Sequence, residues 1–196
     1  LFKQSYWKMF VMFFVLFIGS SVASYFLFLG KEDELTFLLI KIQEMFIEKG
    51  LFDLDMSSFE LAIMLLKNNA TASFIIYATG IIPLFIPAIF IIIGNGALAG
   101  IVFASMKTAG QGILLPILTG IVPHGIFEIP AIVLSASLAF YVSAGIIRKI
   151  VREDFSLREC LFNSAKTFLL VVLPLLVIAA FVEAYISPAL MRMAGL

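Results

Sequence analysis

The chain has 196 residues, of which 62% are hydrophobic, and its 13 basic side chains balance 13 acidic ones. Its mean hydropathy of +1.13 is far above that of soluble domains, in which only about half of the residues are apolar. We therefore predict an integral membrane protein. Lys and Arg form no cluster with interleaved aromatic residues, so we expect no nucleic-acid partner. The single cysteine, Cys160, excludes an internal disulfide and a CxxC motif.

The apolar runs predict an all-α, polytopic transmembrane bundle that forms a single membrane domain over residues 1–196. It should have about five full spans, one re-entrant half-helix and one outer amphipathic helix. Spans of ~20 residues leave no room for a separate soluble domain. The first span is expected over residues 6–29, with Trp7 and Lys8 near its start. This run is too long for a signal-peptide core, so we expect it to be retained.

Residues 31–56 are acidic and predict an amphipathic helix outside the bilayer. Their acidic side chains are Glu32, Asp33, Glu34, Glu44, Glu48, Asp53 and Asp55. Helical periodicity places apolar residues on one stripe, which consists of Leu35, Leu38, Leu39, Ile42, Met45, Phe46 and Leu51. We expect this stripe to lie on the membrane surface or to pack on a partner.

The second and third spans are expected to end near residues 79 and 107. Ser57 or Ser58 should cap the second span, where Glu60 fits the capping-box pattern only loosely. The third span contains GALAG, which matches the GxxxG motif for close helix packing. Gly94, Gly96 and Gly100 therefore predict either an internal helix contact or a dimer seam.

Residues 110–120 are apolar but too short to cross, and they predict the re-entrant half-helix. The fourth span should cover residues 123–147, followed by a charged loop or interfacial helix. The last span should cover residues 161–186 and stop at Ser187 and Pro188. Pro130 and Pro174 each free a backbone carbonyl, so we expect a kink or break beside Pro130.

Basic residues near the span ends predict the orientation. Lys3 and Lys8 precede the first span, and Arg148, Lys149, Arg152 and Arg158 follow the fourth. Four crossings put both groups on one side, which the positive-inside rule makes cytoplasmic. The acidic segment 31–56 then lies outside.

A small set of polar residues inside the spans needs partners, because each costs roughly 2.5 to 3.5 kcal/mol on insertion scales. His124 and Glu128 are four residues apart, so they share one helix face. Glu128 should lie about 8 Å below the outer start of its helix, and Glu183 about 8 Å below the outer end of its own. Helices of opposite direction would then bring the three side chains to one level in the outer leaflet.

Two carboxylates in a low-dielectric site cannot both stay charged without compensation. The compensating group could be protonated His124, Lys67, a shared proton or a divalent metal, with zinc favoured by the ligand types. An amide from Asn68, Asn69 or Asn95, or a water, would complete a site of His124, Glu128 and Glu183, and Glu60 is a weaker candidate. A purely structural set of hydrogen bonds and a proton- or substrate-handling site are the alternatives. HGIFE lacks the second histidine of HExxH, so it does not support a zinc protease.

Four strings in fixed order between positions 67 and 188 resemble one family. KNNATASF, IGNGALAG, PHGIFEIPA and AAFVEAYISP are similar to the stage II sporulation protein M family of multipass bacterial and archaeal membrane proteins. The resemblance implies a helical protein of the inner membrane that helps to remodel the septum during engulfment. Its motif positions here would be Asn68, Asn69, Asn95, Pro123, His124, Gly125, Glu128 and Glu183.

The resemblance also implies partners, because the founding member works with the D and P proteins of the same stage, which degrade peptidoglycan. We therefore expect a membrane scaffold without enzymatic activity that is homodimeric, contacts membrane lipid and recruits such hydrolases on its outer face. The alternative is a metal-dependent intramembrane enzyme or a small transporter that uses His124, Glu128 and Glu183 directly.

Overall fold

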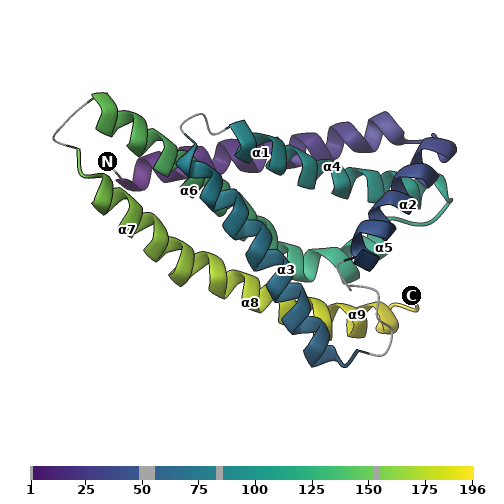
Figure 1. Cartoon of the computed structure of the whole chain (residues 1–196). Helices are drawn as coiled ribbons and strands as arrows, with labels where there is room; N and C mark the ends of the chain where they lie inside the picture. The colour runs from purple at the N-terminus through teal and green to yellow at the C-terminus, as the bar shows by residue number, and fades with distance from the viewer. Residues whose placement is uncertain (1, 49–55, 83–85, 152–154) are drawn as a thin grey trace.

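The structure, a computed structural model, describes residues 2–48, 56–82, 86–151 and 155–196, without the side chains of residues 2–6 and 46. Within these ranges the chain is helical and contains no strand (Figure 1). The elements are α1 (Phe2–Phe28), α2 (Glu32–Glu48), α3 (Ser58–Ala78), η1 (Thr79–Ile81), α4 (Ile86–Thr108), α5 (Leu114–Pro116), η2 (Ile117–Ile121), α6 (Val122–Val151), α7 (Leu157–Thr167), η3 (Phe168–Val172), α8 (Leu173–Phe181), η4 (Val182–Ile186) and α9 (Ser187–Met193). Of the η elements, η1 is a 3-10 turn and the other three are π-helical.

Five helices among the described residues are long and apolar enough to cross a membrane. They cover Trp7–Phe28, Ser58–Ile81, Ile86–Thr108, Leu114–Val151 and Leu157–Met193. This confirms the predicted all-α, polytopic architecture with five spans. In Figure 1 the start of α1, the end of α3 and the start of α7 lie toward the left, and we call this the N-terminal end. The opposite, C-terminal end carries α2, α5 and α9.

The glycine motif of the third span packs against another helix of the same chain. A β-carbon at Gly96 would meet the backbone carbonyl of Phe17, and one at Gly100 would meet that of Ser21. Both partner residues lie on α1, which packs along α4. For Gly96 and Gly100 the predicted internal helix contact is therefore present. Gly94 is exposed, and a β-carbon there would meet nothing within 4 Å.

The amphipathic helix α2 packs on its own chain. Leu35 is buried in a small core with Ile101 and Ala104 of α4. Leu38 and Ile42 of the predicted stripe extend this core, together with Tyr25 and Phe28 of α1. The expectation that the stripe lies on the membrane surface or on a partner is therefore wrong for Leu35, Leu38 and Ile42, which cover the ends of α1 and α4. Leu51 and the side chain of Phe46 lie outside the described part.

A second apolar face of α2 remains exposed. Phe37, Ile40 and Ile47 are 62%, 49% and 55% exposed. They follow one another at helical spacing on the side away from the Leu35 core. Their presence explains why a single predicted stripe did not describe the helix.

The second span begins with a complete capping box. The side chain of Ser57 accepts a hydrogen bond from the backbone N–H of Glu60, and the Glu60 carboxylate accepts one from the Ser57 backbone. The Ser57 hydroxyl also donates to that carboxylate at 2.7 Å. The pattern that looked only loosely met in the sequence is therefore fully formed.

Replacing Ser57 with alanine removes one half of this box, and we expect the free energy of unfolding to fall by about 1 kcal/mol. Equilibrium unfolding in detergent would measure the loss. Ser58→Ala is the matched control, since its side chain lies one position inside the helix. An equal loss in both variants would contradict the assigned cap.

The predicted re-entrant half-helix is wrong in this structure. Residues 114–121 continue without a break into α6, and the whole element Leu114–Val151 has 38 residues. Pro116 lies in the first turn of this helix. A backbone N–H there would have no acceptor within the helix, so its absence in proline breaks no hydrogen bond. The segment is too short to cross only if a new helix starts at Pro123, and in the structure it does not.

Three prolines in the last two spans each follow a π-helical turn. Pro123, Pro174 and Pro188 lie two residues after η2, η3 and η4 respectively. A proline ring clashes with the carbonyl four residues earlier, and each of those carbonyls lies at the centre of its π turn. In every turn the hydrogen bond from the following residue skips to the carbonyl five residues back. The wider turn therefore lets the helix pass the proline.

The last two spans differ from the prediction at two places, Ser187 and Pro130. The last span does not stop at Ser187 and Pro188 but continues through α9 to Met193. Pro130 lies inside α6, whose helical assignment runs through it unbroken. The irregular backbone beside His124 is thus η2, upstream of the histidine, and not a break at Pro130.

Candidate metal centre

His124, Glu128 and Glu183 meet near the C-terminal end of the bundle. One ligand atom from each lies within 4.8 Å of the other two. Nε2 of His124 and Oε2 of Glu128 are 4.0 Å apart. The first two residues lie one turn apart on α6, and Glu183 lies in η4. Two different spans therefore supply the cluster.

The packing of the last two spans brings these residues together. The α6 helix packs against α8 and η4, and α9 packs against η2. Because the two spans run in opposite directions, the start of α6 lies level with η4. A β-carbon at Gly120 would lie only 3.3 Å from the sulfur of Met191, which shows how closely α9 approaches η2. The three side chains therefore lie at one level, as the sequence predicted.

Ser187 adds a fourth polar group that the sequence argument missed. Its Oγ lies 3.5 Å from Nδ1 of His124, and the carbonyl of Gly120 also interacts with the ring. These two contacts orient the ring so that Nε2 faces Glu128. The signal was the four-residue spacing of Glu183 and Ser187, which places both on one helix face.

The cluster is partly buried and lacks a basic partner. The side chains of His124 and Glu128 are 15% and 21% exposed. The ion pairs within the described ranges do not join Glu128 or Glu183 to any Lys or Arg. Lys67, one of the predicted counter-charges, is exposed on α3. Protonated His124, a shared proton or a bound cation are the compensating charges that fit this geometry.

The donor set suits a divalent transition metal. One imidazole nitrogen and two carboxylate oxygens are ordinary zinc ligands, with bonds of about 2.0 to 2.2 Å. Tetrahedral bonds of that length put ligand atoms about 3.3 Å apart. The three atoms lie within 4.8 Å of one another, so they would need to approach by at most about 1.5 Å, which side-chain rotation can supply. Three protein ligands would leave one position for water.

The predicted supporting amides do not join the cluster in the structure. Asn68 donates to Asn69 at 3.3 Å, and Asn95 donates to the carbonyl of Ile91 at 2.8 Å. The carboxylate of Glu60 is occupied by the cap at Ser57. These hydrogen bonds satisfy the side chains within their own helices, so the sequence overestimated the number of candidate ligands.

Aromatic contacts show how far Asn68 and Asn69 lie from the level of Glu183 along the bundle. Phe59 packs near Phe181, and Tyr77 stacks on Phe168, so α3 runs antiparallel to the last span. Asn68 therefore lies about halfway along, roughly 13 Å from the level of Glu183 at 1.5 Å per residue. That separation is too large for a shared metal.

Comparison with known proteins extends over almost the whole chain. The family model described as "Stage II sporulation protein M" matches residues 9–188. The chain belongs to this family. The matched range includes all four residues of the site, His124, Glu128, Glu183 and Ser187. The expected family resemblance is therefore confirmed.

Two proteins similar to this chain come from Methanocaldococcus jannaschii. "Uncharacterized protein MJ0793" is 34% identical over 131 residues, which cover 63% of this chain and 69% of the relative. "Uncharacterized protein MJ0706" is 30% identical over 124 residues, which cover 62% of this chain and 53% of the relative. No solved structure matches the chain.

Proposed function

We propose that this chain is a membrane anchor without enzymatic activity, working in the manner of the stage II sporulation protein M family. It lies in the cytoplasmic membrane and holds peptidoglycan-degrading partners of the stage II D and P type at the septum, where the membranes are remodelled during engulfment. The family match over residues 9–188 carries this proposal. The five spans support it, because they leave mainly short segments outside the bilayer for any chemistry of its own.

The charge distribution supports a cytoplasmic N-terminus. Lys8 and Arg148 lie at the N-terminal end, as does Arg158 at the start of α7. The first turn of α2, at the opposite end, consists of Glu32, Asp33 and Glu34. Under the positive-inside rule the N-terminal end faces the cytoplasm. The exposed apolar face of α2 would then be presented outside, where the hydrolases act.

We further assign the cluster of His124, Glu128 and Glu183 a structural role with a divalent cation, zinc being favoured. A cation there would tie η4 to α6 and neutralise the two carboxylates. The wider turn η4 carries Glu183, and η2 ends three residues before His124; such π turns are frequent at functional sites. The cation would keep the outer end of the anchor in one shape. The predicted homodimer stays a prediction, since Gly96 and Gly100 pack on α1.

Capture of the complete chain from cross-linked host membranes, followed by mass spectrometry, tests the anchor role. We expect enrichment of peptidoglycan hydrolases relative to an unrelated five-span protein. Phe37→Ser with Ile40→Ser should reduce that enrichment several-fold, because both residues lie on the exposed face of α2.

Ile150→Ser is the matched control for this capture. Ile150 is 75% exposed at the N-terminal end, on the opposite side of the proposed membrane. The control should retain the hydrolases. Capture without any peptidoglycan hydrolase contradicts the anchor. Turnover of a substrate by the purified chain that stops in Glu128→Gln would establish the enzyme alternative instead.

A further inference from the structure

Lys67 is a basic side chain inside a membrane span, and it has no counter-charge in the described part of the chain. It is exposed on α3, within the second span, Ser58–Ile81. The stretch from Glu60, in the capping box at the start of α3, to Lys67 corresponds to about 10 Å of depth. A lysine side chain reaches about 6 Å, so the ammonium group stays inside the hydrocarbon layer. The ion pairs within the described ranges do not include Lys67.

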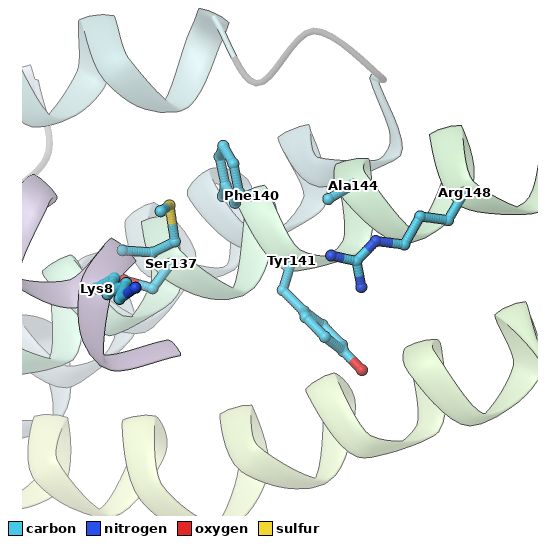
Figure 2. A pocket seen from close by; sticks show the side chains of 7 residues that line it. Lys8, Ser137, Phe140, Tyr141, Ala144 and Arg148 are labelled. Carbon is cyan, nitrogen blue, oxygen red and sulfur yellow. The ribbon is translucent and has the colours of Figure 1, made fainter. Parts of the chain in front are cut away.

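The other basic residues of the five described spans lie near span ends. Lys8 and Arg148, which Figure 2 shows at separate places beside a pocket between α1 and α6, are each within four residues of the end of a span. Lys166 lies level with the C-terminal end of α3, because Tyr77 stacks on Phe168. From such positions a basic side chain reaches the headgroups. Lys67 differs from them in its depth, so it needs a partner inside the bilayer.

A second copy of the chain does not supply the missing carboxylate. Away from the span ends, the acidic residues of the five described spans are Glu128 and Glu183. Both belong to the cluster near the C-terminal end, about 12 Å from the level of Lys67 by helical rise. A copy inserted in the same direction would place its own pair at that same distant level. The neighbouring helix α8 is apolar throughout, so the anion that pairs with Lys67 comes from a different molecule.

A groove of about 490 Å³ lies between α3 and the last span, next to Lys67. Thr71 and Phe74 line it and follow Lys67 by one and two turns on the same face of α3. Phe168 and Leu169 line it from the last span. Phe74 and Leu169 are 55% and 58% exposed. The groove is therefore open to the bilayer beside the unpaired charge.

The groove suits an apolar helix. The small residues Ala70 and Ala165 line it from the two spans, and small residues let a further helix approach closely. The hydroxyl of Tyr77 is bonded to that of Ser164 at 2.9 Å, so this polar group is satisfied within the chain. An acyl chain could fill the groove, but it would bring no negative charge to the depth of Lys67. An apolar helix with one carboxylate would provide both.

We propose that Lys67 and this groove bind a transmembrane helix of another protein that carries an aspartate or glutamate at the depth of Lys67. The carboxylate pairs with the ammonium group, and apolar residues one and two turns away on the partner helix pack against Phe74 and Phe168. Ionisable residues within membranes pair in this way, because each is otherwise exposed to hydrocarbon. The contact lies inside the bilayer and depends neither on hydrolase binding at α2 nor on a metal at His124.

Photo-cross-linking in host membranes, with benzoylphenylalanine in place of Thr71 in the complete chain, tests this contact. We expect cross-linked peptides from a membrane span of another protein that contains an aspartate or glutamate. Lys67→Leu should reduce the yield per chain about threefold or more, as for loss of a polar contact between membrane helices. Lys67→Arg should retain the cross-link, because it keeps the charge.

Lys166→Leu is the matched control, since it makes the same change at the headgroup level, next to Ala165 of the groove. It should leave the yield unchanged. Benzoylphenylalanine in place of Ile75 is the control for position. Ile75 is 53% exposed on α3 but does not line the groove, so this probe should not give the same cross-link.

A charge exchange decides between a direct pair and an indirect effect of Lys67. Replacing the acidic residue of the cross-linked partner span with lysine should abolish the cross-link, and Lys67→Glu in this chain should restore it. Adducts with lipid alone, cross-links to a second copy, an equal yield in Lys67→Leu, or failure of the exchange with both proteins in the membrane would overturn the proposal. Circular dichroism shows whether each purified variant is folded, and if Lys67→Leu is not, the exchange decides.

Discussion

Glu183→Gln is expected to weaken zinc binding by the purified chain by more than about 100-fold. Glutamine keeps the size of the side chain but removes the charge, and an uncharged amide is a far poorer zinc ligand than a carboxylate. Removing hydrogen-bonding partners of a ligand alone costs about 10- to 100-fold in metal affinity. Loss of one ligand of only three from the protein should cost more. Competition with a chromophoric chelator in detergent measures the change.

Glu34→Gln is the matched control, since Glu34 is an exposed carboxylate in α2 at the same end of the bundle. It should leave zinc affinity unchanged. Ser187→Ala should have an intermediate effect of about 10- to 100-fold, because Ser187 contacts His124 and not the proposed metal. Unaltered affinity in both Glu183→Gln and Glu128→Gln would show that zinc binds elsewhere.

Gly96→Leu is expected to cause a large loss of stability. A β-carbon at this position meets the backbone of Phe17 and the hydroxyl of Ser20, and backbone cannot move aside as a flexible side chain can. Overpacking ordinarily costs about 1 to 3 kcal/mol. Here it would also separate α1 from α4, so we expect the free energy of unfolding to fall by about 3 kcal/mol or more. Equilibrium unfolding in detergent, with expression yield in membranes, gives the measurement.

Gly94→Leu provides the control on the same helix. It introduces the same side chain two residues away, where a β-carbon has open space. It should cause no loss of stability, because helix propensity favours leucine over glycine by up to about 0.8 kcal/mol. Comparable losses in the two variants would mean that a leucine side chain anywhere on α4, and not the contact between α1 and α4, explains the result.

Apolar periodicity predicted the five spans well because the bilayer imposes length and composition on each crossing. It failed where proline was taken as a boundary. Pro123 and Pro188 each follow a π-helical turn that carries the helix past the ring. Whether a proline ends a helix or widens it depends on the packing of neighbouring elements, and here α9 packs against η2.

The level of the candidate site was predictable because helical rise converts sequence position into depth. That argument placed Glu128 and Glu183 at one height from the spacing to the span ends. Asn68 and Asn69 were wrong as neighbours for the same physical reason, since helical rise places them much deeper than Glu183. Ser187 was missed because its proline neighbour suggested the end of the helix.

X-ray absorption at the zinc edge, on the purified complete chain supplied with one equivalent of zinc, tests the proposed metal centre most directly. We expect a first shell of nitrogen and oxygen at about 2.0 to 2.2 Å, with the multiple-scattering signal of a single imidazole. That signal should disappear in His124→Ala, because His124 is the one histidine in the chain. A spectrum of hydrated zinc, or one that is unaltered in His124→Ala, would contradict a metal between His124, Glu128 and Glu183.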